Sequence, residues 1–140
     1  MSTLEGFTDA APTISFLSAQ QTLAHAQVDF SAVNASIGDV VQVLNIPKGA
    51  FVTNVFVRVK TAEGGTATAL VGDGTDTTGW DASTNLNSVN TITTCIKGTD
   101  NYAVGKLYTS ADTIDLIPQD ALDTAVIDIF AEYTLVKSYT

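Results

Sequence analysis

Residues 38–60 read GDVVQVLNIPKGAFVTNVFVRVK, and this segment predicts two long strands joined by one tight turn. Apolar and polar side chains alternate on both sides of Pro47-Lys48-Gly49. After the turn, Val55, Val57 and Val59 share one face, and polar or larger side chains take the other. A period of two residues is that of a pleated strand. We therefore expect a hairpin that forms the central pair of a sheet.

The same period recurs on both sides of this hairpin. Turn-forming residues separate further predicted strands at intervals of about 8–12 residues, and the density of Val, Ile and Thr disfavours helices. These strands are expected near residues 26–33, 66–71, 90–96, 104–108, 113–117 and 124–136. Together they predict an all-β fold, an antiparallel β-sandwich, and within that class we favour a jelly-roll.

The length of 140 residues fits one domain with one hydrophobic core. We place a single β-sandwich domain at residues 26–140 and an N-terminal extended arm at residues 1–25. The arm has no regular period, yet it is too apolar for a solvated tail. It is expected to pack either on its own sheet or on a neighbouring subunit, and the sequence leaves both open. Its interface candidates are Leu4, Phe7, Ile14, Phe16 and Leu17.

The charge and apolar patterns exclude several classes of partner. Fifteen acidic and six basic residues give a net charge of -9, which repels phosphate backbones and argues against a nucleic-acid partner. No segment reaches the roughly 20 apolar residues that a membrane helix needs, and the N-terminus lacks the basic region of a secretory signal. We therefore expect no membrane partner and synthesis in a cytoplasm.

The segment GDGTDTTGWD, residues 72–81, predicts a loop because its glycines and aspartates interrupt a strand ladder. Asp73, Asp76 and Asp81 are hard oxygen ligands in a glycine-rich setting, so calcium binding is one hypothesis. Their spacing does not follow the EF-hand pattern, and a structured turn without metal is the other interpretation. Trp80 offers either a stacking face for a sugar or an anchor that holds the loop on the sandwich or on a partner subunit. We include Trp80 among the interface candidates.

No pattern of catalytic residues is visible. A nucleophilic triad would have to use His25, the only histidine, and no nucleophile motif accompanies it. Cys95, the only cysteine, lies among β-branched residues and is expected to be a buried thiol rather than a reactive nucleophile. Acidic residues are too common in this chain for a carboxylate pair to indicate hydrolysis. We predict a protein that is not an enzyme and needs no cofactor.

Several segments resemble small structural proteins of tailed-bacteriophage heads, of the kind described as capsid decoration or cement proteins. The matching motifs are GDVV at 38–41, IPKG at 46–49, VGDGTD at 71–76 with GW at 79–80, YTSADTIDL at 108–116 and AVIDI at 125–129. The resemblance covers about residues 38–136 and leaves the arm outside. The motifs carry no catalytic or binding residue of that family onto this chain.

The resemblance implies a non-enzymatic structural protein that binds the outer surface of an icosahedral phage capsid and stabilises it by bridging capsomers. It implies the major capsid protein as partner and a homo-oligomer, with a trimer favoured over a dimer. It also implies a location in the virion after synthesis in the cytoplasm of a bacterial host. Trp80 and the aspartate loop support one alternative, a carbohydrate-binding or host-adhesion module displayed on a virion.

Overall fold

A computed structural model describes residues 21–95 and 101–136 of the chain. The five interface candidates of the arm lie outside these ranges, and residues 21–25, predicted to belong to the arm, form part of the first strand. Within the described ranges the chain forms nine strands and no helix. They are β1 (Gln21–Asp29), β2 (Val41–Ile46), β3 (Ala50–Thr61), β4 (Thr68–Gly72), β5 (Asp81–Asn85), β6 (Ile92–Thr94), β7 (Lys106–Leu107), β8 (Asp112–Pro118) and β9 (Val126–Leu135).

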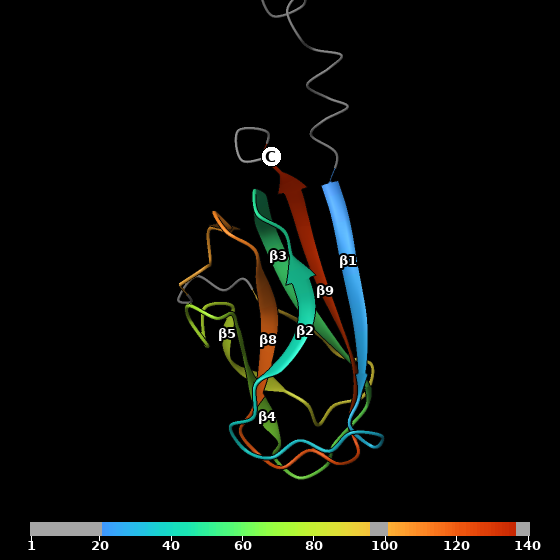
Figure 1. Ribbon diagram of the computed structural model, residues 1–140. Helices are drawn as coiled ribbons and strands as arrows, with labels where there is room; N and C mark the ends of the chain where they lie inside the picture. Colours follow the sequence, from blue (N-terminus) through green and yellow to red (C-terminus); the bar gives the residue numbers. More distant parts are fainter. Residues whose placement is uncertain (1–20, 96–100, 137–140) are drawn as a thin grey trace, which may run out of the picture.

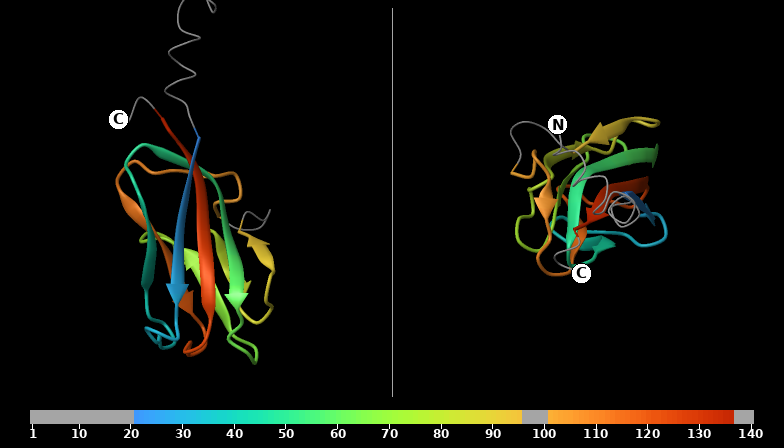
Figure 2. Two further views of the ribbon diagram at one scale, coloured as in Figure 1. Left: turned by 90° about the vertical axis from the view of Figure 1, so that its right-hand side faces the viewer. Right: turned by 90° about the horizontal axis from the view of Figure 1, so that it is seen from above.

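The strands form two sheets that face each other (Figures 1 and 2). The first sheet has the order β1-β9-β3-β6, with β7 also paired to β3, and the second has the order β2-β8-β4-β5. Every pair is antiparallel. The prediction of an all-β antiparallel sandwich is confirmed, and a jelly-roll stays our interpretation of this strand order.

The core lies between the sheets and follows from the alternation of side chains. On β3, Val55, Val57 and Val59 point inward and are at most 1% exposed, as the period of two predicted. On β9, Ile127 and Ile129 are fully buried opposite them. Removing such a side chain from water contributes roughly 1.5–3 kcal/mol, so this central strand pair supplies much of the stability.

The predicted hairpin at residues 38–60 is wrong in its pairing. Both strands exist, but β2 lies in the second sheet and pairs with β8, whereas β3 lies in the first sheet and pairs with β9. The turn at Pro47-Lys48-Gly49 carries the chain from one sheet to the other, with Gly49 at a φ of 89°. Alternation specifies which face of a strand is buried but not which strand lies beside it. Two strands on opposite sides of a sandwich satisfy the same pattern.

Two further strands differ from the prediction. β1 starts at Gln21 rather than near residue 26, because its first half is polar and gives little apolar alternation. β5 was not predicted, since its inward side chains are Asp81 and Thr84 rather than apolar residues. These two side chains satisfy each other, because the Thr84 hydroxyl donates to Asp81 Oδ2 at 2.6 Å.

Candidate functional site

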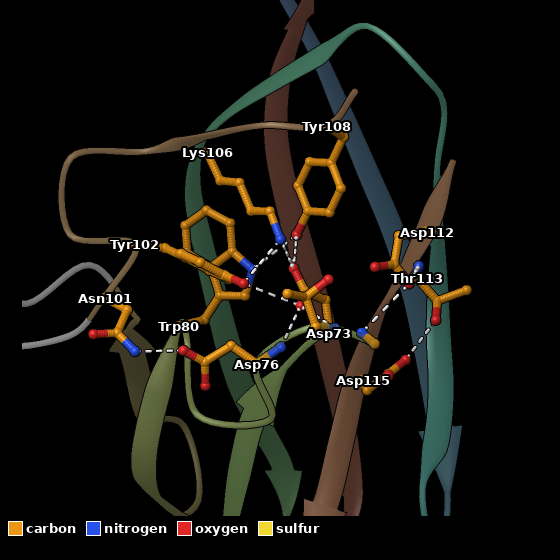
Figure 3. Close-up of polar contacts among 12 residues, drawn as sticks. Asp73, Asp76, Trp80, Asn101, Tyr102, Lys106, Tyr108, Asp112, Thr113 and Asp115 are labelled. Carbon is orange, nitrogen blue, oxygen red and sulfur yellow. Dashed lines mark hydrogen bonds and ion pairs between the residues drawn. The ribbon is translucent and has the colours of Figure 1, made fainter. Parts of the chain in front are cut away.

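A buried aspartate organises the loop between β4 and β5 (Figure 3). The Asp73 side chain has no exposed surface. Its Oδ2 atom accepts hydrogen bonds from Lys106 Nζ at 2.6 Å and from the Tyr108 hydroxyl at 2.8 Å. Its Oδ1 atom accepts from the Tyr102 hydroxyl at 3.1 Å. Both carboxylate oxygens are therefore committed to side chains that lie about 30 positions further along the sequence.

The backbone of the same loop is closed by short-range bonds. Asp73 Oδ1 also accepts from the N–H groups of Thr75 and Asp76, each at 2.9 Å, which is the Asx-turn chemistry of aspartate. The Trp80 N–H donates to the Val71 carbonyl at 3.0 Å and returns the chain to the sheet. A Cβ atom at Gly72 would lie 2.2 Å from the Asp76 carbonyl oxygen, so this turn requires glycine.

Aromatic rings cover the aspartate. Trp80 is fully buried, its Nε1 atom donates to the Tyr108 hydroxyl at 3.3 Å, and its ring packs edge-on against Tyr102 with 5.1 Å between centroids. The Lys106 ammonium lies 4.4 Å from the Tyr102 ring centroid and 4.6 Å from that of Tyr108. Trp80 thus anchors its loop on the sandwich. Its place among the interface candidates is corrected, because a buried indole reaches neither a sugar nor a neighbouring subunit.

The charges of this Asp73 cluster, formed by Asp73, Lys106, Tyr102, Tyr108 and Trp80, are fixed at neutral pH. Burial raises the pKa of Asp73, but the bonds from Lys106, the loop backbone and Tyr108 outweigh it and hold the pKa below its ordinary value. Burial lowers the pKa of Lys106, and the bond to Asp73 outweighs it and raises the pKa. Burial raises the pKa of the Tyr108 hydroxyl. None of these groups is poised to exchange a proton near pH 7. The cluster therefore has a structural role: it holds the loop between β4 and β5 against Tyr102, Lys106 and Tyr108.

The calcium hypothesis gains no support from the geometry. The ammonium of Lys106 already neutralises Asp73, and Asp81 accepts from the Thr84 hydroxyl within its own strand, β5. Asp76 bonds the side chain of Asn101. In the two described ranges, no group of three His, Cys, Asp or Glu side chains is placed to hold a metal ion. The arrangement matches the alternative interpretation, a structured turn.

A second polar cluster lies on the outer face of the first sheet. His25, Phe130 and Phe56 are direct cross-strand neighbours, and their rings stack at centroid distances of 4.7 Å and 4.9 Å. Asp128 Oδ1 lies 2.9 Å from His25 Nε2, and Asp128 Oδ2 lies 3.1 Å from Arg58 Nη1. Burial raises the pKa of Asp128, but the bonds from His25, Gln27 and Arg58 outweigh it and lower the pKa. His25 thus stabilises the surface of the sheet.

Exposed aliphatic side chains gather in the connection from β1 to β2. Val33 is 73% exposed, Ile37 68% and Val40 57%, and all three lie in the connection from β1 to β2. Val33 and Val40 line a groove of about 440 Å³ between the end of β1 and the start of β2, together with Val28 and Phe30. These residues are not among the predicted interface candidates, although three aliphatic residues in a turn-rich connection are a usable signal of a contact surface.

The prediction for Cys95 can be compared with the structure. Cys95 is fully buried, so the predicted buried thiol is confirmed. Among the described residues no helix is long and apolar enough to cross a membrane.

The fold has counterparts among solved structures, although no known protein family and no curated protein matches the sequence. A chain in the capsid of Ralstonia phage GP4 has a TM-score of 0.62 and 13% identity, over 84% of this chain and 85% of that chain. A chain in the acidic stable capsid of Helicobacter pylori bacteriophage KHP30 has a TM-score of 0.60 and 20% identity, over 84% and 90%. A chain of the cyanophage Pam1 capsid asymmetric unit has a TM-score of 0.64 and 19% identity, over 90% and 91%.

These matches cover 84–90% of this chain. At such low identity they establish a shared fold and transfer no residue roles. The chain therefore has a fold that occurs in the capsids of three phages.

Proposed function

We propose that this chain is a non-enzymatic structural protein of a phage virion, which binds the outer surface of the icosahedral capsid and stabilises it by bridging capsomers. Its partner is the major capsid protein, and it acts as a homo-oligomer. The observation that carries the proposal is the shared fold with chains of three phage capsids over 84–90% of this chain. The motifs at residues 38–129 that resemble decoration proteins support the finer role.

The chemistry of the described residues is compatible with a structural role. The most elaborate polar cluster, around Asp73, has no exposed carboxylate surface and no group poised to titrate near neutral pH. By contrast, Val33, Ile37 and Val40 are left exposed, and aliphatic side chains of this kind are buried when proteins assemble. A protein that bridges capsomers needs a rigid fold and such contact surfaces, and it needs no active site.

The alternative of a carbohydrate-binding or host-adhesion module loses its main support. It rested on Trp80 as a stacking face and on the aspartate loop as a calcium site. Trp80 is buried, and the loop is held by Lys106 and two tyrosines. No observation in the described residues favours this function over the capsid role.

Co-sedimentation with shells tests the proposal. Shells of the parent phage, assembled without this protein, would be mixed with the purified full-length chain and pelleted through sucrose. We expect the chain to saturate the shells at a fixed ratio and to raise the temperature at which they break. The same chain denatured before mixing serves as the control. A native chain that stays in the supernatant, together with binding on a glycan array, would overturn the capsid role.

A further inference from the structure

The sheet edges of the sandwich are protected to different degrees. Exposed edges invite pairing with other chains, and proteins protect them by short length, bulges, proline or lysine. β6 has three residues and β5 has five, and the pairing of β5 with β4 is irregular. β2 has six residues and its register shifts between Gln42 and Leu44. These three edges are therefore short or distorted.

β1 has none of these protections. It has nine residues, and its register with β9 runs from Gln21 to Asp29 without a shift. Its sequence, QTLAHAQVD, contains no proline and no lysine. Among the described residues no strand pairs with its outer edge, and the strand stands at the side of the first sheet (Figures 1 and 2). It is a long, regular edge that is ready to accept another strand.

One backbone hydrogen bond shows which backbone groups of β1 point to its free edge. The Phe30 N–H donates to the Ala125 carbonyl of the β9 side at 2.8 Å. In an antiparallel strand the N–H and C=O of a residue point to the same side, and the side alternates at each residue. The backbone groups of Leu23, His25 and Gln27 therefore point to the free edge.

We propose that the occupant of this edge is β1 of a second copy of this chain, paired antiparallel about a two-fold axis at His25. This is the register in which all nine residues of each strand are paired. It joins the two first sheets of the dimer into one continuous sheet through backbone hydrogen bonds. Pairing of a strand with itself is two-fold by geometry, so the proposal assigns a dimer.

The side chains are self-complementary in this register. Gln21 faces Asp29 of the partner strand, so the one carboxylate of β1 meets an amide donor rather than a second carboxylate. Leu23 faces Gln27, and on the inner face the small residues Ala24 and Ala26 face each other. Across this interface no carboxylate of β1 faces another carboxylate, and no ammonium group faces another ammonium group.

The groove beside β1 fits the same occupant. In this register Gln21 of the partner strand lies opposite Asp29, at the end of β1 beside the groove that Phe30, Val33 and Val40 line. The sequence before Gln21 carries the apolar residues Ile14, Phe16 and Leu17. One neighbour therefore offers both a strand for the edge and apolar side chains for the exposed valines.

Light scattering on the full-length protein tests the dimer without any shell, so its failure is separate from failure of the capsid role. We expect twice the chain mass of 14.6 kDa for the native chain. Leu23→Pro removes an N–H from the free edge at a side chain that is 57% exposed, and it should give the monomer mass with an unchanged circular dichroism spectrum. Leu23→Thr keeps the N–H and should stay dimeric.

Cysteine cross-linking tests the register and does not depend on the proline variant. His25→Cys places two thiols on the two-fold axis at a Cα separation of about 5.5 Å, within the range of a disulfide. It should form a covalent dimer on mild oxidation, whereas Leu23→Cys, with its thiols about 13 Å apart, should not. A native mass of one or three chains, a dimeric Leu23→Pro, or cross-linking only by Leu23→Cys would overturn the proposal.

Discussion

The Asp73 cluster and the edge formed by β1 satisfy their chemical groups in opposite ways. Around Asp73, a carboxylate, an ammonium, two phenols and an indole N–H bond to one another inside the fold. At β1, the outward backbone groups have no strand beside them in the described part of the chain, and Val33 and Val40 stand exposed nearby.

This difference separates the part of the molecule that maintains the fold from the part that is available to partners. Changes at the Asp73 cluster should lower the free energy of unfolding. Changes beside β1 should leave that free energy nearly unchanged and alter association instead. Four predictions test this division, from the largest expected effect to the smallest.

Asp73→Ala should have the largest effect on stability. It leaves the Lys106 ammonium, with only 19% of its side chain exposed, without its carboxylate partner at 2.6 Å. Breaking a buried pair from one side costs about 4 kcal/mol. Urea denaturation followed by circular dichroism measures the loss. Asp39→Ala, at an exposed loop carboxylate, is the control. Equal losses of unfolding free energy in the two variants would contradict the claim that the Asp73 cluster stabilises the fold.

Gly72→Ala should come next. Its Cβ atom would lie 2.2 Å from the Asp76 backbone carbonyl, which cannot move without opening the loop, so we expect a loss of about 3 kcal/mol in the free energy of unfolding. Gly74→Ala is the matched control, because its Cβ would meet the Asp112 carboxylate at 3.0 Å and that side chain can rotate away. A chain that tolerates both substitutions equally would show that the loop is not rigid.

Asp115→Asn should stabilise the protein at pH 7. Burial raises the pKa of Asp115 above its ordinary 3.8 and outweighs the hydrogen bond from Thr113, which lowers it, while Asp112 and Asp73 raise it further. The folded state therefore holds this proton more tightly than the unfolded state does. The ionised form therefore destabilises the fold as pH rises through the raised pKa. The gain from Asn should shrink as pH falls toward 3.8.

The lowered pKa of Asp73 has the opposite sign and provides the comparison. Its contribution to stability is complete above 3.8 and is lost as pH falls through the lowered folded value. The penalty of Asp73→Ala should therefore shrink in acid. Denaturation of both variants between pH 3 and 7 measures the two slopes, and slopes of equal sign would contradict these assignments.

Val33→Ser combined with Val40→Ser should have the smallest effect on stability, within about 0.5 kcal/mol, because both side chains are already exposed. The dimer dissociation constant should nevertheless rise by about tenfold or more, since apolar area buried on association is lost. Analytical ultracentrifugation measures it. Val104→Ser, at a residue that is 89% exposed outside the groove, is the control and should change neither quantity.

The sequence was enough to predict which face of each long strand points inward. It was not enough to predict which strand pairs with which. Val55, Val57 and Val59 of β3 were assigned to one face and are buried together. The pairing of β2 with β3 was wrong because the period of two is local, whereas β2 pairs with β8 and β3 with β9 at separations of 65–85 positions in the chain. β5 was missed because its buried side chains are polar.

The loop at residues 72–81 was predicted, but the Asp73 cluster that holds it in place was not. Glycine and aspartate indicated a turn. Of the partners, Lys106 and Tyr108 lie in a segment predicted as a plain strand, and Tyr102 lies just before that segment. A lysine between two tyrosines in so acidic a chain was a usable signal. For the interface, Trp80 was a poor choice because a large apolar residue beside a turn is more often buried as an anchor than exposed.

A reconstruction of the assembled parent particle tests the central claim most directly. The account predicts density for the two-sheet sandwich on the outer surface of the shell, at contacts between neighbouring capsomers. Particles assembled without this protein should lack that density and break at lower temperature. Density for the sandwich only on the inner surface or on the tail, or a particle that contains none of it, would contradict the account.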